Sequence, residues 1–396
     1  MHFGLQYAVV SQIITINNQV ANAANQPYPT YYFGHNLLPP ATVGQITPDQ
    51  VPTISGSILY EDANTRMPRV SQWDVDVQHT FGRSYLLDVA YMGSHGDHLA
   101  KLYNPLDCSV PGTQFCNTNT EPFFPRLTFM QDMSTIGYSN YHALLVKFNK
   151  QFANGLSLLS NFTYSKALSN GNESNNGTLS QDKSCLECDY GLASFNVPLS
   201  LVISAVWELP VGRGRHFGSN MNRLVDGVIG SWSVNAITTM QKGNPFTVVA
   251  PNHVAWPADQ IRADRYCNGR SELQNRDLRS NRMQWLYTGT VSSVNSTCFV
   301  DPFTDPHNTS GQPWYFGTSG FDVLTGPGVN NWDVGVHKAF QIRETMAFTL
   351  RGEFFNAWNH AQFANPNANV NAATFGTVNA TQHAARQIQI GATLKF

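Results

Sequence analysis

The chain has 396 residues, a formal net charge of −2 and only 13% charged residues. Soluble domains usually carry about 25% charged residues, so this composition is not that of a compact, charged enzyme. The near-neutral charge also excludes a large basic surface for nucleic acid. Aromatic residues make up 12% of the chain. A membrane β-barrel with a low-charge outer band, aromatic belts and a polar interior would explain this mixture.

Residues 1–70 give the weakest pattern, and we treat them as a separate region with an N-terminal strand and a long loop. A strand is predicted between Phe3 and Ile16, and another short one begins near Ser57. The start has no Lys or Arg and lacks the apolar core of a signal peptide. No apolar run approaches the ~20 residues of a membrane helix. For an exported protein, the lack of an obvious signal peptide indicates a fragment of a longer protein or a misplaced start.

From residue 71 onward, apolar and polar residues alternate with the period of two that is typical of strands. Short turns are predicted at 81–84, 152–155, 210–220 and 341–345. Long connections are predicted between them, at 94–137, 170–198, 243–330 and 359–385. The four hairpins and a closing strand make about nine strands, or about ten or eleven with those before residue 70.

The order of these connections indicates the fold class. Successive connections of a meandering barrel lie on opposite rims, so all short turns share one rim and all long loops share the other. Outer-membrane barrels have short periplasmic turns and long extracellular loops. We therefore predict an all-β, antiparallel up-and-down transmembrane β-barrel over 71–396. It would lie in the cell outer membrane, in contact with lipid.

The closing strand has one apolar face and one polar face. Its apolar face carries Ile388, Ile390, Ala392, Leu394 and Phe396. Because chain ends are usually polar and frayed, a final aromatic residue has to be held by something. We interpret Ile388, Ile390, Leu394 and Phe396 as a membrane-facing assembly signal.

Three tryptophans near strand ends, Trp207, Trp232 and Trp332, have two possible roles. In a soluble protein they would be core residues, whereas in a barrel they would be interface aromatics at the membrane surface. The apolar faces of the strands favour interface aromatics.

The six cysteines fall into three local pairs within the long connections. These pairs are Cys108 with Cys116, Cys185 with Cys188, and Cys267 with Cys298. An even number of cysteines in loops predicts disulfides in an oxidising compartment. Cys185 and Cys188 have the spacing of half a zinc site, but no second pair with that spacing completes it. Loop disulfides are the favoured interpretation.

Other polar clusters suggest no catalytic, cofactor or metal site. The segment 94–98, Ser-His-Gly-Asp-His, is interpreted as a turn after a strand end. The segment 212–218 lacks the spacing of a phosphate-binding loop and precedes no expected helix. Its two arginines would also suit anionic lipid head groups, but a plain turn is the favoured interpretation. Asp301 and Asp305 lack the ligand spacing of a calcium loop. Asp74 and Asp76 would face the lumen and tune a polar channel. We expect no enzyme activity.

Several segments resemble Oar-like TonB-dependent receptors. These segments are 71–78 with 91–99, then 161–167, 208–212 and 352–359, followed by the terminal Phe396. Together they place the resemblance over roughly residues 55–396, and five motifs in order make it fairly specific. In that family, the final aromatic residue is read by the barrel-assembly machinery.

The resemblance implies a receptor for uptake of a substrate, which the sequence does not identify. The family's barrel has about 22 strands, with an internal plug and a preceding domain, and it couples to TonB near its N-terminus. None of those parts is apparent in this chain. It would therefore correspond to the C-terminal half of a barrel and would reach TonB only through parts that it lacks. The alternative is a secreted or surface all-β binding or adhesion protein.

Overall fold

The computed structural model describes ten stretches of the chain. They are 54–61, 64–103, 127–170, 180–182, 185–251, 260–266, 284–286, 298–305, 316–343 and 345–396. The predicted strand between Phe3 and Ile16 lies outside them, and so do Cys108, Cys116 and Cys267.

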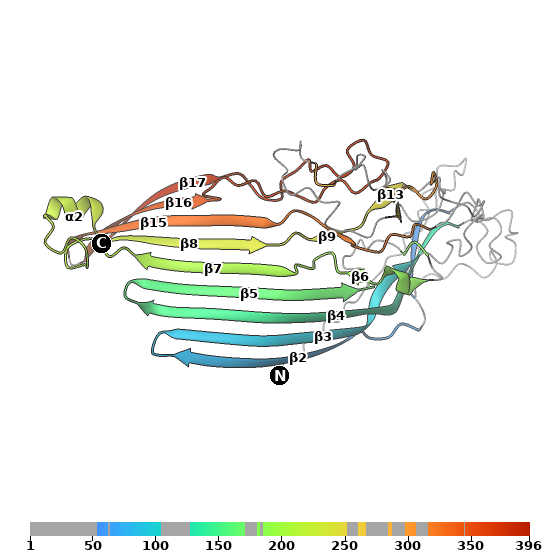
Figure 1. Cartoon of the computed structure of the whole chain (residues 1–396), viewed down its shortest axis with the longest axis horizontal. Helices are drawn as coiled ribbons and strands as arrows, with labels where there is room; N and C mark the ends of the chain where they lie inside the picture. The colour runs from blue at the N-terminus through green and yellow to red at the C-terminus, as the bar shows by residue number, and fades with distance from the viewer. Residues whose placement is uncertain are drawn as a thin grey trace, which may run out of the picture.

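One large sheet organises the described residues (Figure 1). It has 11 strands, and nine of them form a continuous path in the order β17-β16-β15-β8-β7-β5-β4-β3-β2. The path strands are β2 (Arg69–Phe81), β3 (Tyr85–Tyr103), β4 (Leu127–Ala153), β5 (Leu156–Ser169), β7 (Leu199–Glu208), β8 (Trp232–Gln241), β15 (Val329–Arg343), β16 (Met346–Phe355) and β17 (Gln387–Lys395). Neighbours on this path are antiparallel. The predicted all-β, up-and-down partial barrel is confirmed.

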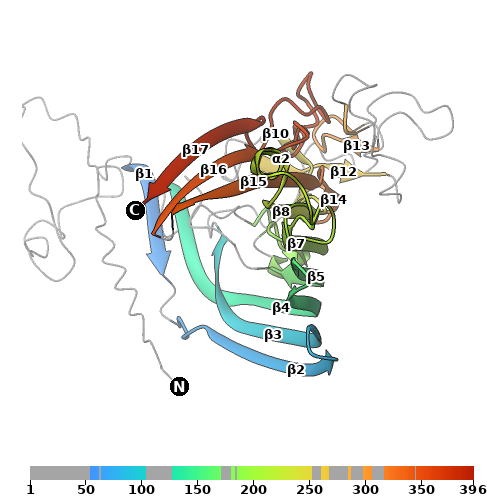
Figure 2. The same cartoon turned by 90° about the vertical axis from the view of Figure 1, so that its left-hand side faces the viewer.

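The sheet curves into an open arc and does not close into a barrel within the described residues (Figure 2). Its two edges are β2 and β17, which do not pair with each other. Two further strands lie off the main path: β1 (Ile54–Glu61) pairs in parallel with β4, and β6 (Gly191–Leu192) pairs with β5.

The register gives the sheet one apolar face and one polar face, because neighbouring strands place like residues opposite each other. Val77 of β2 lies opposite Val89 of β3, which lies opposite Val146 of β4. At the other edge, Phe354 lies opposite Ile388. In a barrel wall the apolar face is directed to lipid and the polar face to the lumen. We call these the lipid face and the lumen face.

The strand bounds correct the predicted connection at 94–137. β3 continues to Tyr103 and β4 begins at Leu127, so both strands extend well beyond the ~10 residues that cross a bilayer. The segment 94–98 therefore lies within β3 rather than in a turn. The sequence pattern missed this extension because Gly and small polar residues interrupt the alternation there.

The predicted short turn at 210–220 also needs correction. β7 ends at Glu208 and β8 begins at Trp232, and the connection contains helix α2 (Arg223–Ile229). Asn222 caps this helix by accepting a hydrogen bond from the backbone N–H of Leu224 at 3.1 Å. None of the helices in the described stretches is long and apolar enough to span a membrane.

Candidate functional site

At the long-loop rim, the connections fold into a layer with its own core. The loop layer comprises the described parts of 170–198, 242–328 and 356–386, with short strands β9 (Pro245–Phe246), β10 (Val249–Pro251), β11 (Gln260–Arg262), β12 (Asp264–Arg265), β13 (Phe299–Val300) and β14 (Leu324–Thr325). Its buried core consists of Phe246, Val248, Ala263, Leu286, Phe299 and Leu324. All six lie in the connection 242–328, and Ala368, Val370 and Phe375 of the connection 356–386 pack against them, so this core holds the two connections in one arrangement.

A buried ion cluster of Lys101, Asp189 and Arg262 joins this layer to the sheet. Lys101 comes from the extension of β3, Asp189 from the 3₁₀ helix η2 (Leu186–Asp189), and Arg262 from β11. The Lys101 Nζ atom lies 2.9 Å from Asp189 Oδ2, and Arg262 forms an ion pair with the other carboxylate oxygen. The Lys101 side chain is only 1% exposed. One carboxylate therefore compensates two cations from different connections.

The charge state of Asp189 follows from these contacts. Burial favours the neutral acid, but Lys101 and Arg262 outweigh burial and hold the pKa of the Asp189 carboxyl below its usual value. Neighbouring hydrogen bonds extend the cluster. Gln181 accepts from the backbone N–H of Arg262 at 2.9 Å and donates to the carbonyl of Gly317 at 3.0 Å. The cluster thus fixes connections 170–198 and 242–328 to each other.

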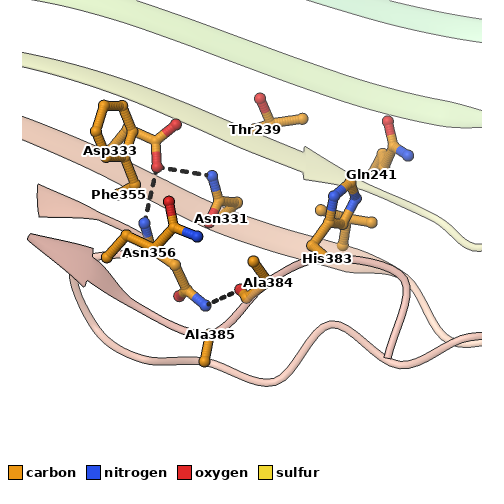
Figure 3. Close-up of a pocket in the computed structure, with 11 residues that line it drawn as sticks. Thr239, Gln241, Asn331, Asp333, Phe355, Asn356, His383, Ala384 and Ala385 are labelled. Atoms are coloured by element: carbon orange, nitrogen blue, oxygen red, sulfur yellow. Dashed lines mark hydrogen bonds between the residues drawn. The ribbon is translucent and has the colours of Figure 1, made fainter. Parts of the chain in front are cut away.

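A polar cavity of about 330 Å³ opens beside this rim (Figure 3). It is bounded by the lumen face of the sheet and by the final connection before β17. Its walls are Thr239, Gln241, Val329, Asn331, Asp333, Phe355, Asn356, His383, Ala384, Ala385 and Gln387. Amide, hydroxyl and imidazole groups can donate and accept hydrogen bonds, and Asp333 adds one carboxylate. These groups can hydrogen-bond a small solute, and Val329, Phe355, Ala384 and Ala385 add an apolar part of the wall.

Asn356 holds the wall of this cavity together. Its backbone N–H donates to Asp333 Oδ1 at 2.8 Å, and its side-chain oxygen accepts from the backbone N–H of His360 at 2.9 Å. The side-chain amide donates to the carbonyls of His360 and Ala384, at 3.0 and 3.3 Å. Asn356 also has a φ of 50°, a left-handed conformation that Asn tolerates better than most residues.

We expect Asn356→Ala to loosen the connection 359–385 by about 2–3 kcal/mol, because it removes buried hydrogen bonds and adds left-handed strain. Limited proteolysis of outer-membrane fractions should show faster cleavage in this connection than in the parent chain. Asn356→Gly is the matched control, since glycine keeps the backbone conformation and loses only the side-chain bonds. Equal cleavage of the parent and the alanine variant would contradict this role.

The family of the chain is decided by comparison with known proteins. A family model for the outer membrane β-barrel domain matches residues 3–389. The chain belongs to this family. This confirms the outer-membrane β-barrel part of the family resemblance seen in the sequence, and it places the protein in the cell outer membrane.

Solved structures similar to this barrel chain include the outer membrane transporter YddB from Escherichia coli. That match has a TM-score of 0.44 and 11% identity, and it covers 87% of this chain and 35% of YddB. The FrpB iron transporter from Neisseria meningitidis matches with a TM-score of 0.39 and 10% identity, over 86% of this chain and 33% of FrpB. The barrel chain spans about a third of the length of these structures. No curated protein matches it.

Aromatic residues lie at both ends of the lipid face of the barrel chain. Trp207 and Trp232 lie at the short-turn end of β7 and β8, and Trp332 lies at the long-loop end of β15. Trp207 is 46% exposed, and the Trp332 ring contacts Trp358 edge-on. On β2 and on β15, an aromatic pair eight residues apart brackets a lipid-facing stretch of roughly 27 Å. The pairs are Trp73 with Phe81 and Trp332 with Phe340. These positions suit two interface belts.

The cysteine pairs are described only in part. Cys185 and Cys188 form a disulfide beside η2, in the same connection as Asp189. Cys298 is also disulfide-bonded. The described residues contain no group of three or more His, Cys, Asp or Glu side chains that could hold a metal ion.

The residues interpreted as an assembly signal lie on β17 and just after it. Ile388, Ile390 and Leu394 are 57%, 78% and 49% exposed on the lipid face, and Phe396 is 92% exposed. These exposed side chains are available for contact with lipid or with another protein. Their role as a signal stays a prediction.

Two clusters that the sequence raised as possible ligand sites have structural partners. His95 Nε2 lies 2.8 Å from Asp97 Oδ1, and Arg69 donates to Asp97 Oδ2 at 2.8 Å. Asp301 accepts from the backbone N–H of Phe303 at 3.0 Å and from the Asn371 side chain, and Asp305 accepts from the Tyr266 hydroxyl. Both clusters stabilise local structure at the long-loop rim.

Sequence reasoning missed the ion cluster and the cavity. Lys101 and Asp189 lie 88 residues apart, and neither has a neighbour in the sequence that marks it as buried. The cavity combines residues of four strands, β8, β15, β16 and β17, with the final connection. No periodic pattern in the sequence could have brought these groups together. Helix α2, by contrast, could have been predicted from Asn222 followed by apolar residues at helical spacing.

Proposed function

We propose that the chain forms barrel wall and substrate-capturing loops of a TonB-dependent, Oar-like receptor that takes up a polar solute. The observation that carries this proposal is the polar cavity at the rim, where the lumen face meets the folded loop layer. A solute bound there lies at the mouth of the lumen. Energy coupling would act through TonB and a plug supplied by other parts of the receptor. The proposal assigns no catalytic residue.

The barrel-assembly machinery and outer-membrane lipid are the other partners in this proposal. Exposed apolar residues on the lipid face support a lipid partner. The exposed edge of β17, with its apolar residues, supports recognition during assembly. The alternative function is a surface binding or adhesion protein that uses the loop layer alone. The polar lumen face favours transport, because adhesion does not require a polar lumen.

Solute accumulation in cells tests the two functions. Cells with and without the coding segment would be given a mixture of labelled polar solutes, and uptake would be measured with and without a protonophore. Transport predicts at least one solute whose accumulation needs both the chain and the proton-motive force. Attachment of the same cells to surfaces would be measured in parallel. If every solute accumulates equally in all four conditions while cells without the coding segment attach less, the adhesion alternative is supported and transport is rejected.

A further inference from the structure

The connection between β7 and β8 is a folded unit on the short-turn rim, where α2 projects beyond the strand ends (Figure 1). We call residues 210–231 the rim segment. The backbone N–H of Phe217 donates to the carbonyl of Pro210 at 2.8 Å, and that of Ser231 donates to Val211 at 3.0 Å. Asp226 accepts from the backbone N–H of Arg213 at 2.8 Å, which ties the turn to the helix.

The rim segment is anchored to the lipid face. Lys338 shares that face with Trp232, its cross-strand partner, and with Phe340. The Lys338 ammonium donates to the carbonyls of Gly230 and Asp226 at the end of α2, and the residue is only 3% exposed. The Trp232 indole donates to the carbonyl of Val228 at 2.9 Å. These contacts hold α2 against the lipid side of the barrel wall.

The outer side of α2 is apolar and exposed. Leu224, Val225, Val228 and Ile229 are 81%, 45%, 69% and 47% exposed. Their spacing of one, three and one places them on one side of a helix. In water such a cluster would be an unfavourable apolar patch on a helix of only seven residues. Its place on the lipid side puts it on the same face of the sheet as the exposed Trp207 of β7.

The charges of the rim segment complement anionic head groups. The segment carries three arginines, Arg213, Arg215 and Arg223, against a single carboxylate, Asp226. All three arginines are exposed, and Arg215 also pairs with Glu208 at 3.0 Å. Guanidinium groups bind phosphate oxygens in bidentate geometry. An apolar helix face flanked by arginines has the composition of a helix that lies in a membrane interface.

We propose that the rim segment is an interfacial anchor that inserts α2 into the periplasmic leaflet of the outer membrane. Leu224, Val225, Val228 and Ile229 contact the acyl chains near the head-group boundary, and the arginines contact anionic phospholipid head groups. The anchor fixes the depth of the β7–β8 wall in the bilayer. Lipid is the occupant because the patch continues the apolar surface that the barrel wall already presents to lipid.

Site-specific photocrosslinking in the outer membrane of intact cells tests this inference. A photoreactive amino acid would replace Leu224 in the full chain, and phospholipids would be labelled with radioactive phosphate. Two neighbouring positions on β2 serve as references: Val75 on the lipid face and Asp76 on the lumen face. We expect the Leu224 position to give lipid adducts at about the level of Val75, and several-fold above Asp76.

Each outcome decides the inference. Lipid adducts at Val75 but not at Leu224 would overturn it, and a protein adduct at Leu224 would show that a protein covers the helix instead. Absence of lipid adducts at both positions would overturn the membrane placement of the whole apolar face. A second variant, Leu224→Gln with Val228→Gln, makes the outer side of α2 polar and leaves the backbone carbonyls that Lys338 and Trp232 contact in place. It should lower lipid adducts from a probe at Ile229 several-fold.

Discussion

Val77→Arg is expected to destabilise the folded barrel wall by about 2–4 kcal/mol, the cost of an arginine at the bilayer midplane on the lipid face of a barrel. Val77 lies midway between Trp73 and Phe81, the aromatic residues that bracket the lipid-facing stretch of β2. Its side chain is 69% exposed on the lipid face. A charge there cannot reach either head-group region without distorting the strand or the bilayer.

Gln78→Arg is the matched control, because Gln78 is the next residue and lies on the lumen face, opposite Asp88. The same charge in a polar lumen should change stability by less than about 1 kcal/mol. Urea unfolding in lipid vesicles, followed by heat-modifiable gel mobility, gives both free energies. Equal losses in the two variants would mean that lipid does not cover the face that carries Val77.

The alternation of side chains made much of the sheet predictable from the sequence. Period-two patterns located the nine path strands, and the Asn154-Gly155 turn between β4 and β5 lies where the sequence places it. A one-residue error in register would turn every apolar side chain to the other face, so the pattern determines both strand and face. The lipid face of β17 was predictable for this reason.

The ends of the strands and the site were not predictable in the same way. β3 and β4 continue beyond the membrane, where no lipid imposes alternation and where His98 has a φ of 57° beside a register shift. The loop layer is held by contacts between distant residues. The loop sequences carry no periodic pattern, so the sequence alone does not show which of the 24 lysines and arginines form ion pairs with Asp189.

Asp189→Asn is expected to weaken the attachment of the loop layer to the sheet by about 3–5 kcal/mol, because removing one partner leaves buried charge without compensation. Lys101 and Arg262 would both lose their counter-ion, and the Lys101 side chain is almost fully buried. Opening of the layer should then raise its rate of proteolysis by about a hundredfold or more, if opening is fast relative to cleavage.

Glu187→Gln is the matched control, since Glu187 lies in the same 3₁₀ helix and is exposed. It should leave the proteolysis rate unchanged. Adding Lys101→Met to Asp189→Asn removes the more deeply buried of the two uncompensated cations and should recover part of the loss. If Asp189→Asn and Glu187→Gln behave alike, the buried ion cluster does not hold the layer.

Acid provides an independent test of the same carboxylate. Because the folded-state pKa of Asp189 is lowered, its contribution is complete above the ordinary carboxyl pKa of roughly 4. The contribution is lost only as the pH falls through the lower, folded-state value. Proteolysis of the loop layer in the parent protein by an acid-active protease should therefore stay slow as the pH falls to about 5 and accelerate only at pH values below the ordinary carboxyl pKa. The loop layer of Asp189→Asn should be cleaved rapidly both at about pH 5 and at lower pH, since asparagine has no carboxylate to protonate. A parallel acceleration in both proteins would assign the acid sensitivity to other groups.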